Sequence, residues 1–181
     1  IGGGMANTFL AAQGYDVGRS LRDDDLGPAK RLLADAASRG VPLHLPTDVV
    51  IAPSLDAEAS ARTVSLANVD DEMILDIGEA TARAYAAVIE AAKTIVFNGP
   101  MGVYERRAYQ AGTRLVGEAI ARATARGATS VVGGGDAAAA AQQLGFARSV
   151  SHVSTGGGAT LEFLEGKTLP GVAALEVIAA R

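Results

Sequence analysis

Short apolar runs alternate with longer amphipathic stretches along most of the chain. The apolar runs have the length of strands and are rich in β-branched residues, as in Thr94–Phe97 and Thr129–Val132. The stretches between them repeat apolar residues at helical spacing, most clearly in Glu79–Ala92. This alternation predicts an α/β, Rossmann-like three-layer domain with a mostly parallel sheet.

Glycine and proline mark the ends of these elements, as Pro28 near a helix start and Gly40 just past its end illustrate. The predicted helices are Met5–Gln13, Pro28–Arg39, Glu79–Ala92, Thr113–Arg126, an alanine-rich helix that opens at the glycines 133–135 and reaches Leu144, and Ala159–Leu164. The predicted strands are Val41–Leu45, Asp48–Ala52, Arg62–Leu66, Thr94–Phe97, Thr129–Val132 and His152–Ser154.

The composition narrows the class of protein. A chain of 181 residues with 49% hydrophobic residues suits a single domain. A net charge of −4 without a dense Lys/Arg run gives little support to nucleic-acid binding. The absence of cysteine excludes disulfides and thiolate metal sites. No run approaches the roughly 18–20 apolar residues of a membrane span, so we expect a cytoplasmic protein without membrane contact.

Three Gly-Gly-Gly triplets, at positions 2–4, 133–135 and 156–158, stand where apolar runs give way to helical sequence. Glycine lets backbone N–H groups approach an oxyanion closely, and a following helix start adds partial positive charge. One triplet is weak evidence, because tight turns also use glycine. Three at the carboxyl ends of strands in one sheet favour a nucleotide-phosphate site. Neither a G-x-G-x-x-G fingerprint nor a complete Walker loop is present.

Residues 96–105, Val-Phe-Asn-Gly-Pro-Met-Gly-Val-Tyr-Glu, resemble a motif of the phosphoglycerate kinase family. Its pattern is an aromatic residue, Asn-Gly-Pro-Met-Gly-Val, a second aromatic residue and Glu. Three more stretches resemble the same family: residues 1–6, residues 131–136, and residues 151–159 continued by 164–171. Together they correspond to the family's C-terminal, nucleotide-binding domain over residues 1–181. The chain starts at Ile1, directly before a glycine triplet, so we expect an upstream N-terminal substrate domain that this sequence lacks.

The resemblance implies phosphoryl transfer between 1,3-bisphosphoglycerate and ADP to give 3-phosphoglycerate and ATP in glycolysis, in a monomer that uses Mg²⁺. The phosphoglycerate would be held by the N-terminal domain. Glu105 would accept hydrogen bonds from the ribose hydroxyls. The rest of the nucleoside would be lined by Gly3, Gly4, Leu21, Gly78, Asn98, Pro100 and Val103. The phosphate chain would meet Gly134, Gly135, Asp136 and the backbone of Ala137. The transferring phosphoryl group would be stabilised by the catalytic residues Gly135, Gly157 and Gly158.

Asp136 is the candidate metal ligand, because Mg²⁺ prefers few protein oxygens together with phosphate and water. The alternative role is a helix N-cap, which is common for aspartate. The family usually has Ser or Thr after this aspartate, whereas Ala137 offers no hydroxyl. Leu21, judged from its residue type alone, would be an ordinary core residue.

Two other function classes stay open from the residues themselves. One is a non-catalytic nucleotide-binding module or a dinucleotide-binding dehydrogenase domain that shares only the fold. The other is a structural domain whose glycines merely turn the chain. Neither His44 nor His152 is given a catalytic role. Without the substrate domain and the family's upstream lysines, we expect residues 1–181 alone to bind Mg·ADP or Mg·ATP weakly and not to turn over.

Overall fold

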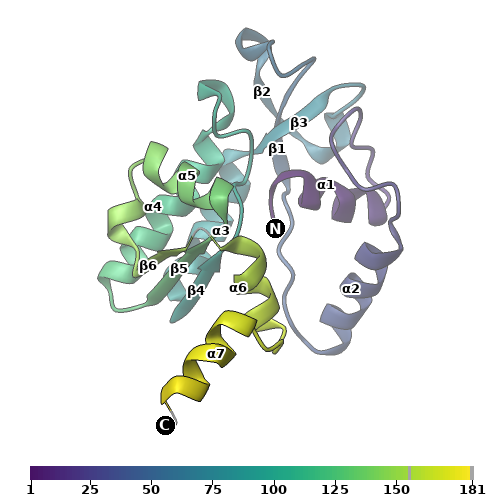
Figure 1. The fold of residues 1–181 in the computed structure, drawn as a ribbon. Helices are drawn as coiled ribbons and strands as arrows, with labels where there is room; N and C mark the ends of the chain where they lie inside the picture. The colour runs from purple at the N-terminus through teal and green to yellow at the C-terminus, as the bar shows by residue number, and fades with distance from the viewer. Residues whose placement is uncertain (155, 180–181) are drawn as a thin grey trace.

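A computed structural model describes residues 1–154 and 156–179 of the protein (Figure 1). Its helices are α1 (Gly3–Ala12), α2 (Gly27–Ser38), α3 (Glu79–Ala91), α4 (Ala111–Ala125), α5 (Gly135–Gln143), α6 (Gly157–Leu164) and α7 (Pro170–Ala179). Its strands are β1 (Asp48–Ala52), β2 (Arg62–Ser65), β3 (Met73–Ile77), β4 (Thr94–Phe97), β5 (Thr129–Gly133) and β6 (His152–Ser154). Single 3₁₀ turns are η1 (Glu58–Ser60), η2 (Leu66–Asn68), η3 (Arg107–Tyr109) and η4 (Ala147–Ser149).

The described strands form two three-stranded sheets within a layered α/β arrangement (Figure 1). One sheet has the order β4-β5-β6 and is parallel throughout, with Phe97 opposite Val132 and Gly133 opposite Ser154. The second has the order β2-β1-β3 and is antiparallel, with a register shift between Val50 and Ile51. The three-layer α/β class and its parallel sheet are confirmed, and the antiparallel sheet adds a feature that the pattern did not indicate.

The main core lies between the parallel sheet and its covering helices. α3 and α4 pack side by side, α4 contacts β5, and α5 contacts both β5 and β6. Phe97 of β4 meets Phe146 edge to face, with ring centroids 6.0 Å apart. Val132 and Ile120 are fully buried in the same cluster. This packing fixes the carboxyl ends of β4, β5 and β6 at one rigid edge.

Most predicted elements are confirmed, several of them to the residue, including β1, β4 and β6. The prediction of a strand at Val41–Leu45 is wrong, because this segment has no strand pairing in the structure. Pro42 within it and Pro46 after it lack the N–H groups that a ladder needs. The strand β3 and the helix α7 had no counterpart among the predictions. Thr155, part of the motif at 151–159, lies outside the described residues. None of the described helices has the length and apolarity needed to cross a bilayer.

Candidate functional site

The loop that follows β4 joins the first glycine triplet to the second. Gly3 N donates to Met101 O at 2.9 Å, so the start of α1 is hydrogen-bonded to this loop. On the other side, Asn98 Oδ1 lies 3.5 Å from where a Cβ of Gly134 would be. The loop residues Asn98 and Pro100 therefore lie between the helix starts of α1 and α5, as a single ligand site requires.

The second and third triplets are in backbone contact. Gly134 N donates to Ser154 O at 2.9 Å, and a Cβ on Gly157 would lie 2.7 Å from Gly134 Cα. Only glycine permits that approach, and Gly134 itself has φ of 104°, a conformation that L side chains rarely adopt. The N-termini of α5 and α6 consequently converge, and their free amides and partial positive charges suit a shared anionic ligand.

Asp136 is an exposed residue in the first turn of α5. The N-cap position belongs to Gly134, and no side-chain hydrogen bond caps this helix, so Asp136 is not an N-cap. Burial raises the pKa of the Tyr104 hydroxyl, and the negative charges of Glu105 and Asp136 raise it further. Gln143, in α5, donates from Nε2 to Tyr104 O at 3.1 Å, so the loop residue next to Glu105 contacts the helix that carries Asp136.

A lone carboxylate at this position fits the metal expected there. Among the described residues, no group of three or more His, Cys, Asp or Glu side chains is placed to enclose a metal ion. Mg²⁺ does not need such a cage, since it commonly takes one or two carboxylates and fills its other positions with phosphate oxygens and water. Asp136 beside two glycine-lined helix starts offers this partial donor set.

Leu21 is exposed, and the expectation of a core residue from its type is therefore wrong. Its side chain is 77% exposed, and its Cδ2 lies 3.3 Å from the position of a Cβ on Gly4. Asn7 holds it in place by donating from Nδ2 to Leu21 O at 3.0 Å. Gly4 and Leu21 line one cavity of about 500 Å³ with Met5 and Thr8. An apolar side chain over a glycine at an open cavity provides a flat wall for a ring.

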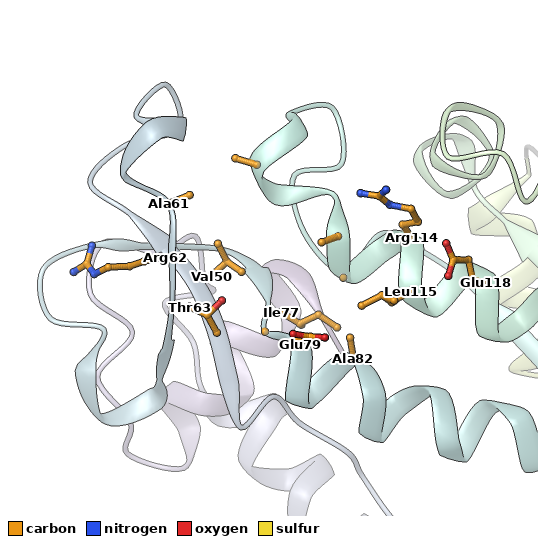
Figure 2. A pocket seen from close by; sticks show the side chains of 14 residues that line it. Val50, Ala61, Arg62, Thr63, Ile77, Glu79, Ala82, Arg114, Leu115 and Glu118 are labelled. Carbon is orange, nitrogen blue, oxygen red and sulfur yellow. The ribbon is translucent and has the colours of Figure 1, made fainter.

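Gly78 lies apart from this cavity. It is the buried N-cap of α3, and a side chain there would overlap the carboxylate of Asp48, which accepts a hydrogen bond from Thr81 N at 2.7 Å. Gly78 instead lines a cavity of about 530 Å³ between the β1–β2 hairpin and the starts of α3 and α4 (Figure 2). The structure does not bring Gly78 into one cavity with Gly4 and Leu21.

Two of the charged side chains that line this second cavity are ion-paired. The carboxylate of Glu79 pairs with Arg83 one helical turn along, and Arg62 makes a two-pronged ion pair with Glu72. Apolar side chains such as Val50 and Leu115 also line the cavity (Figure 2). None of the other predicted site residues lines it.

The fold is an α/β domain in which glycine-lined helix starts lie at the carboxyl ends of the parallel strands. Comparison with known proteins specifies the family: the family model described as Phosphoglycerate kinase matches residues 1–167. The chain belongs to the phosphoglycerate kinase family.

Individual relatives agree with this assignment. The chain is 53% identical over 177 residues to "Phosphoglycerate kinase" of Roseiflexus sp. (strain RS-1) and 52% identical over 178 residues to that of Chloroflexus aurantiacus. Each alignment covers 97% of this chain and 44% of the relative. The solved phosphoglycerate kinase of Coxiella burnetii is similar with a TM-score of 0.89 and 45% identity, over 96% of this chain and 44% of that one. The Pyrococcus horikoshii OT3 enzyme gives a TM-score of 0.73 at 34% identity, over 97% and 44%. The chain thus spans less than half the length of these relatives.

Proposed function

We propose that this chain supplies the nucleotide-binding half of a phosphoglycerate kinase, which transfers a phosphoryl group between 1,3-bisphosphoglycerate and ADP to give 3-phosphoglycerate and ATP. The observation that carries the proposal is the convergence of the 98–105 loop with the starts of α1, α5 and α6 in a member of this family. Family membership favours this kinase over the dinucleotide-binding dehydrogenase. The substrate site for phosphoglycerate lies outside residues 1–181 in this proposal.

The nucleotide would lie along the edge from α1 to α6. The adenine would stack over Gly3, Gly4 and the exposed side chain of Leu21. The carboxylate of Glu105 would accept hydrogen bonds from the ribose, because it is exposed and belongs to the loop that faces α5. The middle of the nucleotide would be held by Asn98, Pro100 and Val103. Gly78 would have to contact the nucleotide from the start of α3.

The phosphate chain would meet the N-terminus of α5. Gly134, Gly135 and Ala137 offer backbone N–H groups there, and the side chain of Ala137 is only 1% exposed, so that residue can contribute only its amide. Asp136 would hold Mg²⁺, which when bound supplies charge neutralisation for the phosphates. We extend the proposal to a monomeric, cytoplasmic enzyme.

Catalysis in this proposal depends on position and electrostatics. The bond between the acyl oxygen of 1,3-bisphosphoglycerate and phosphorus breaks, and a bond from phosphorus to a β-phosphate oxygen of ADP forms in line with it. The phosphoryl group would pass between the starts of α5 and α6. Amides of Gly135, Gly157 and Gly158 would stabilise its equatorial oxygens, which carry most of the charge in the transition state. A water-poor setting would strengthen each of these hydrogen bonds.

The test is steady-state turnover by the intact protein that carries this chain, together with titration calorimetry. We expect ATP formation from 1,3-bisphosphoglycerate and Mg·ADP, and binding of Mg·ADP in preference to NADH. A protein that binds NADH more tightly than Mg·ADP would instead be a dinucleotide-binding domain. A protein that binds neither nucleotide would support a purely structural role for the glycines.

A further inference from the structure

Two buried polar side chains lie directly beneath the loop that follows β4. Asp76, in β3, is 1% exposed, and Thr113, in the first turn of α4, is 0% exposed. Asp76 Oδ2 accepts a hydrogen bond from Gly112 N at 2.7 Å, and its Oδ1 accepts one from Ile77 N at 2.9 Å. The carboxylate therefore connects β3 to the start of α4.

These two side chains contact two consecutive loop residues, and the backbone of β3 holds the third. Thr113 Oγ1 accepts a hydrogen bond from Met101 N at 3.0 Å. A Cβ on Gly102 would lie 2.5 Å from Asp76 Oδ1, so the loop backbone rests against this carboxylate and only glycine fits there. Val103 N then donates to Leu75 O at 2.9 Å. The segment from Met101 to Val103 is consequently fixed to β3 and α4.

Burying these groups is costly, and the site beside them explains why they are there. Desolvation raises the pKa of the Asp76 carboxyl to about 7, although the N–H groups of Gly112 and Ile77 act in the opposite direction. A buried carboxylate rarely adds net stability compared with an apolar residue of similar size. Its benefit must therefore come from the arrangement that it specifies.

We propose that Asp76 and Thr113 are positioning residues for the nucleotide, acting through the backbone of Met101 and Gly102. This inference rests on the proposed function, because the same short loop carries Asn98 and Glu105 on either side of the fixed segment. The two residues act through the loop backbone and need no contact with the substrate. Loosening them displaces several nucleotide contacts at once and leaves the phosphoglycerate site unchanged.

The decisive variants are Thr113→Val and Thr113→Ser in the intact protein. Valine keeps the shape of threonine and removes the acceptor for Met101 N, whereas serine keeps the hydroxyl. With Mg·ATP and 3-phosphoglycerate as substrates, we expect Thr113→Val to raise the KM for Mg·ATP about tenfold, the size of effect that one lost buried hydrogen bond produces. The KM for 3-phosphoglycerate should stay within about twofold. Thr113→Ser should return the KM for Mg·ATP to near the parent value. Asp76→Asn should shift KM in the same direction as Thr113→Val, because an amide cannot accept from both N–H groups.

Ser130→Ala is the matched control for general destabilisation. Ser130 is also 0% exposed and accepts a hydrogen bond from Ser151 N at 3.0 Å, but it lies at the start of β5, away from the carboxyl end where Gly133 lies. We expect a lower melting temperature with an unchanged KM for Mg·ATP. A parent-like KM for Mg·ATP in Thr113→Val, or an equal rise in Ser130→Ala, overturns the inference. If the parent itself has no kinase activity, the proposed function fails and the positioning role fails with it, whereas an active parent with an unaffected Thr113→Val variant refutes the positioning role alone. Should Asp76→Asn fail to fold, the two threonine variants decide the question.

Discussion

Alanine at position 157 should separate the starts of α5 and α6. Its Cβ would lie 2.7 Å from Gly134 Cα, whereas ordinary van der Waals contact begins at 3.4 Å. The obstructing atom belongs to a backbone and cannot rotate away, so one helix start must move, by about 0.7 Å if an ordinary contact is to be restored. Gly134 and Gly157 both belong to the surface on which phosphoryl transfer is proposed to occur.

A displacement of this size is large for a transfer that depends on alignment. Misplacement of reacting groups by about 1 Å can lower a rate by about 100-fold, so we expect Gly157→Ala to lower kcat on the order of 10- to 100-fold. The intact protein would be assayed in a coupled spectrophotometric reaction with saturating substrates. Circular dichroism would show that the variant remains folded at the assay temperature.

Gly156→Ala provides the control from the same triplet. A Cβ there would lie 3.6 Å from Ser154 Oγ, an ordinary contact, and φ is −85°, which alanine adopts easily. We expect this variant to keep kcat within about threefold of the parent. If Gly157→Ala has the same kcat as Gly156→Ala, the contact between the two helix starts does not set the reaction geometry.

Three further predictions concern the carboxylates. Asp136→Asn should weaken binding of Mg·ADP at least about tenfold with little effect on metal-free ADP, and calorimetry with and without Mg²⁺ separates the two; equal weakening of both would argue against a metal ligand. Glu105→Gln should reduce the ratio of kcat/KM between ADP and 2′-deoxy-ADP, and an unchanged ratio would remove Glu105 from the ribose site. Burial raises the pKa of the Asp76 carboxyl from 3.8 to about 7, so this group binds more protons in the folded than in the unfolded protein. Its contribution to the free energy of unfolding is therefore complete below about pH 4 and is lost as the pH rises to about 7. Between pH 5 and pH 7 the free energy of unfolding, measured by urea titration, should fall by about 2 to 3 kcal/mol more in the parent than in Asp76→Asn. If both proteins show the same pH dependence, the burial argument is contradicted.

The sequence predicted those elements whose local signals agree with their tertiary setting. β4 is an apolar run followed by Asn98, and α3 follows a glycine and repeats apolar residues at helical spacing. Val41–Leu45 failed because hydrophobic residues suggested a strand while its prolines removed ladder donors. The strand β3 was missed for the opposite reason, because the charged residue Asp76 interrupts its apolar run. Its carboxylate accepts hydrogen bonds from Ile77 N and from Gly112 N, and the second donor lies 36 residues away in the sequence.

The candidate site was likewise predictable only where local signals agree with the tertiary structure. The strand ends and glycine triplets were recognisable, because parallel strands bring their carboxyl ends to one edge whatever the rest of the chain does. The exposure of Leu21 and the absence of a capping role for Asp136 depend on where α1 and α5 begin, which a residue pattern fixes only to within a few positions. Thr113 left no signal of its own, since a threonine in the first turn of a helix has many ordinary explanations.

The glycines of the triplets have different physical reasons to be glycine, and the difference bears on function. Gly134 needs its positive φ, and Gly157 needs the close approach to a neighbouring backbone. Gly135 and Gly158 need neither: their φ angles lie outside the left-handed region, and within the described part of the chain nothing lies within 4 Å of a Cβ built on either residue. Folding places no demand for glycine at these two positions, both of which lie in the first turn of a helix at the converging edge. The proposed phosphate group, lying against the backbone amides, would account for glycine at both positions, which are the two helix starts between which the phosphoryl group is proposed to move.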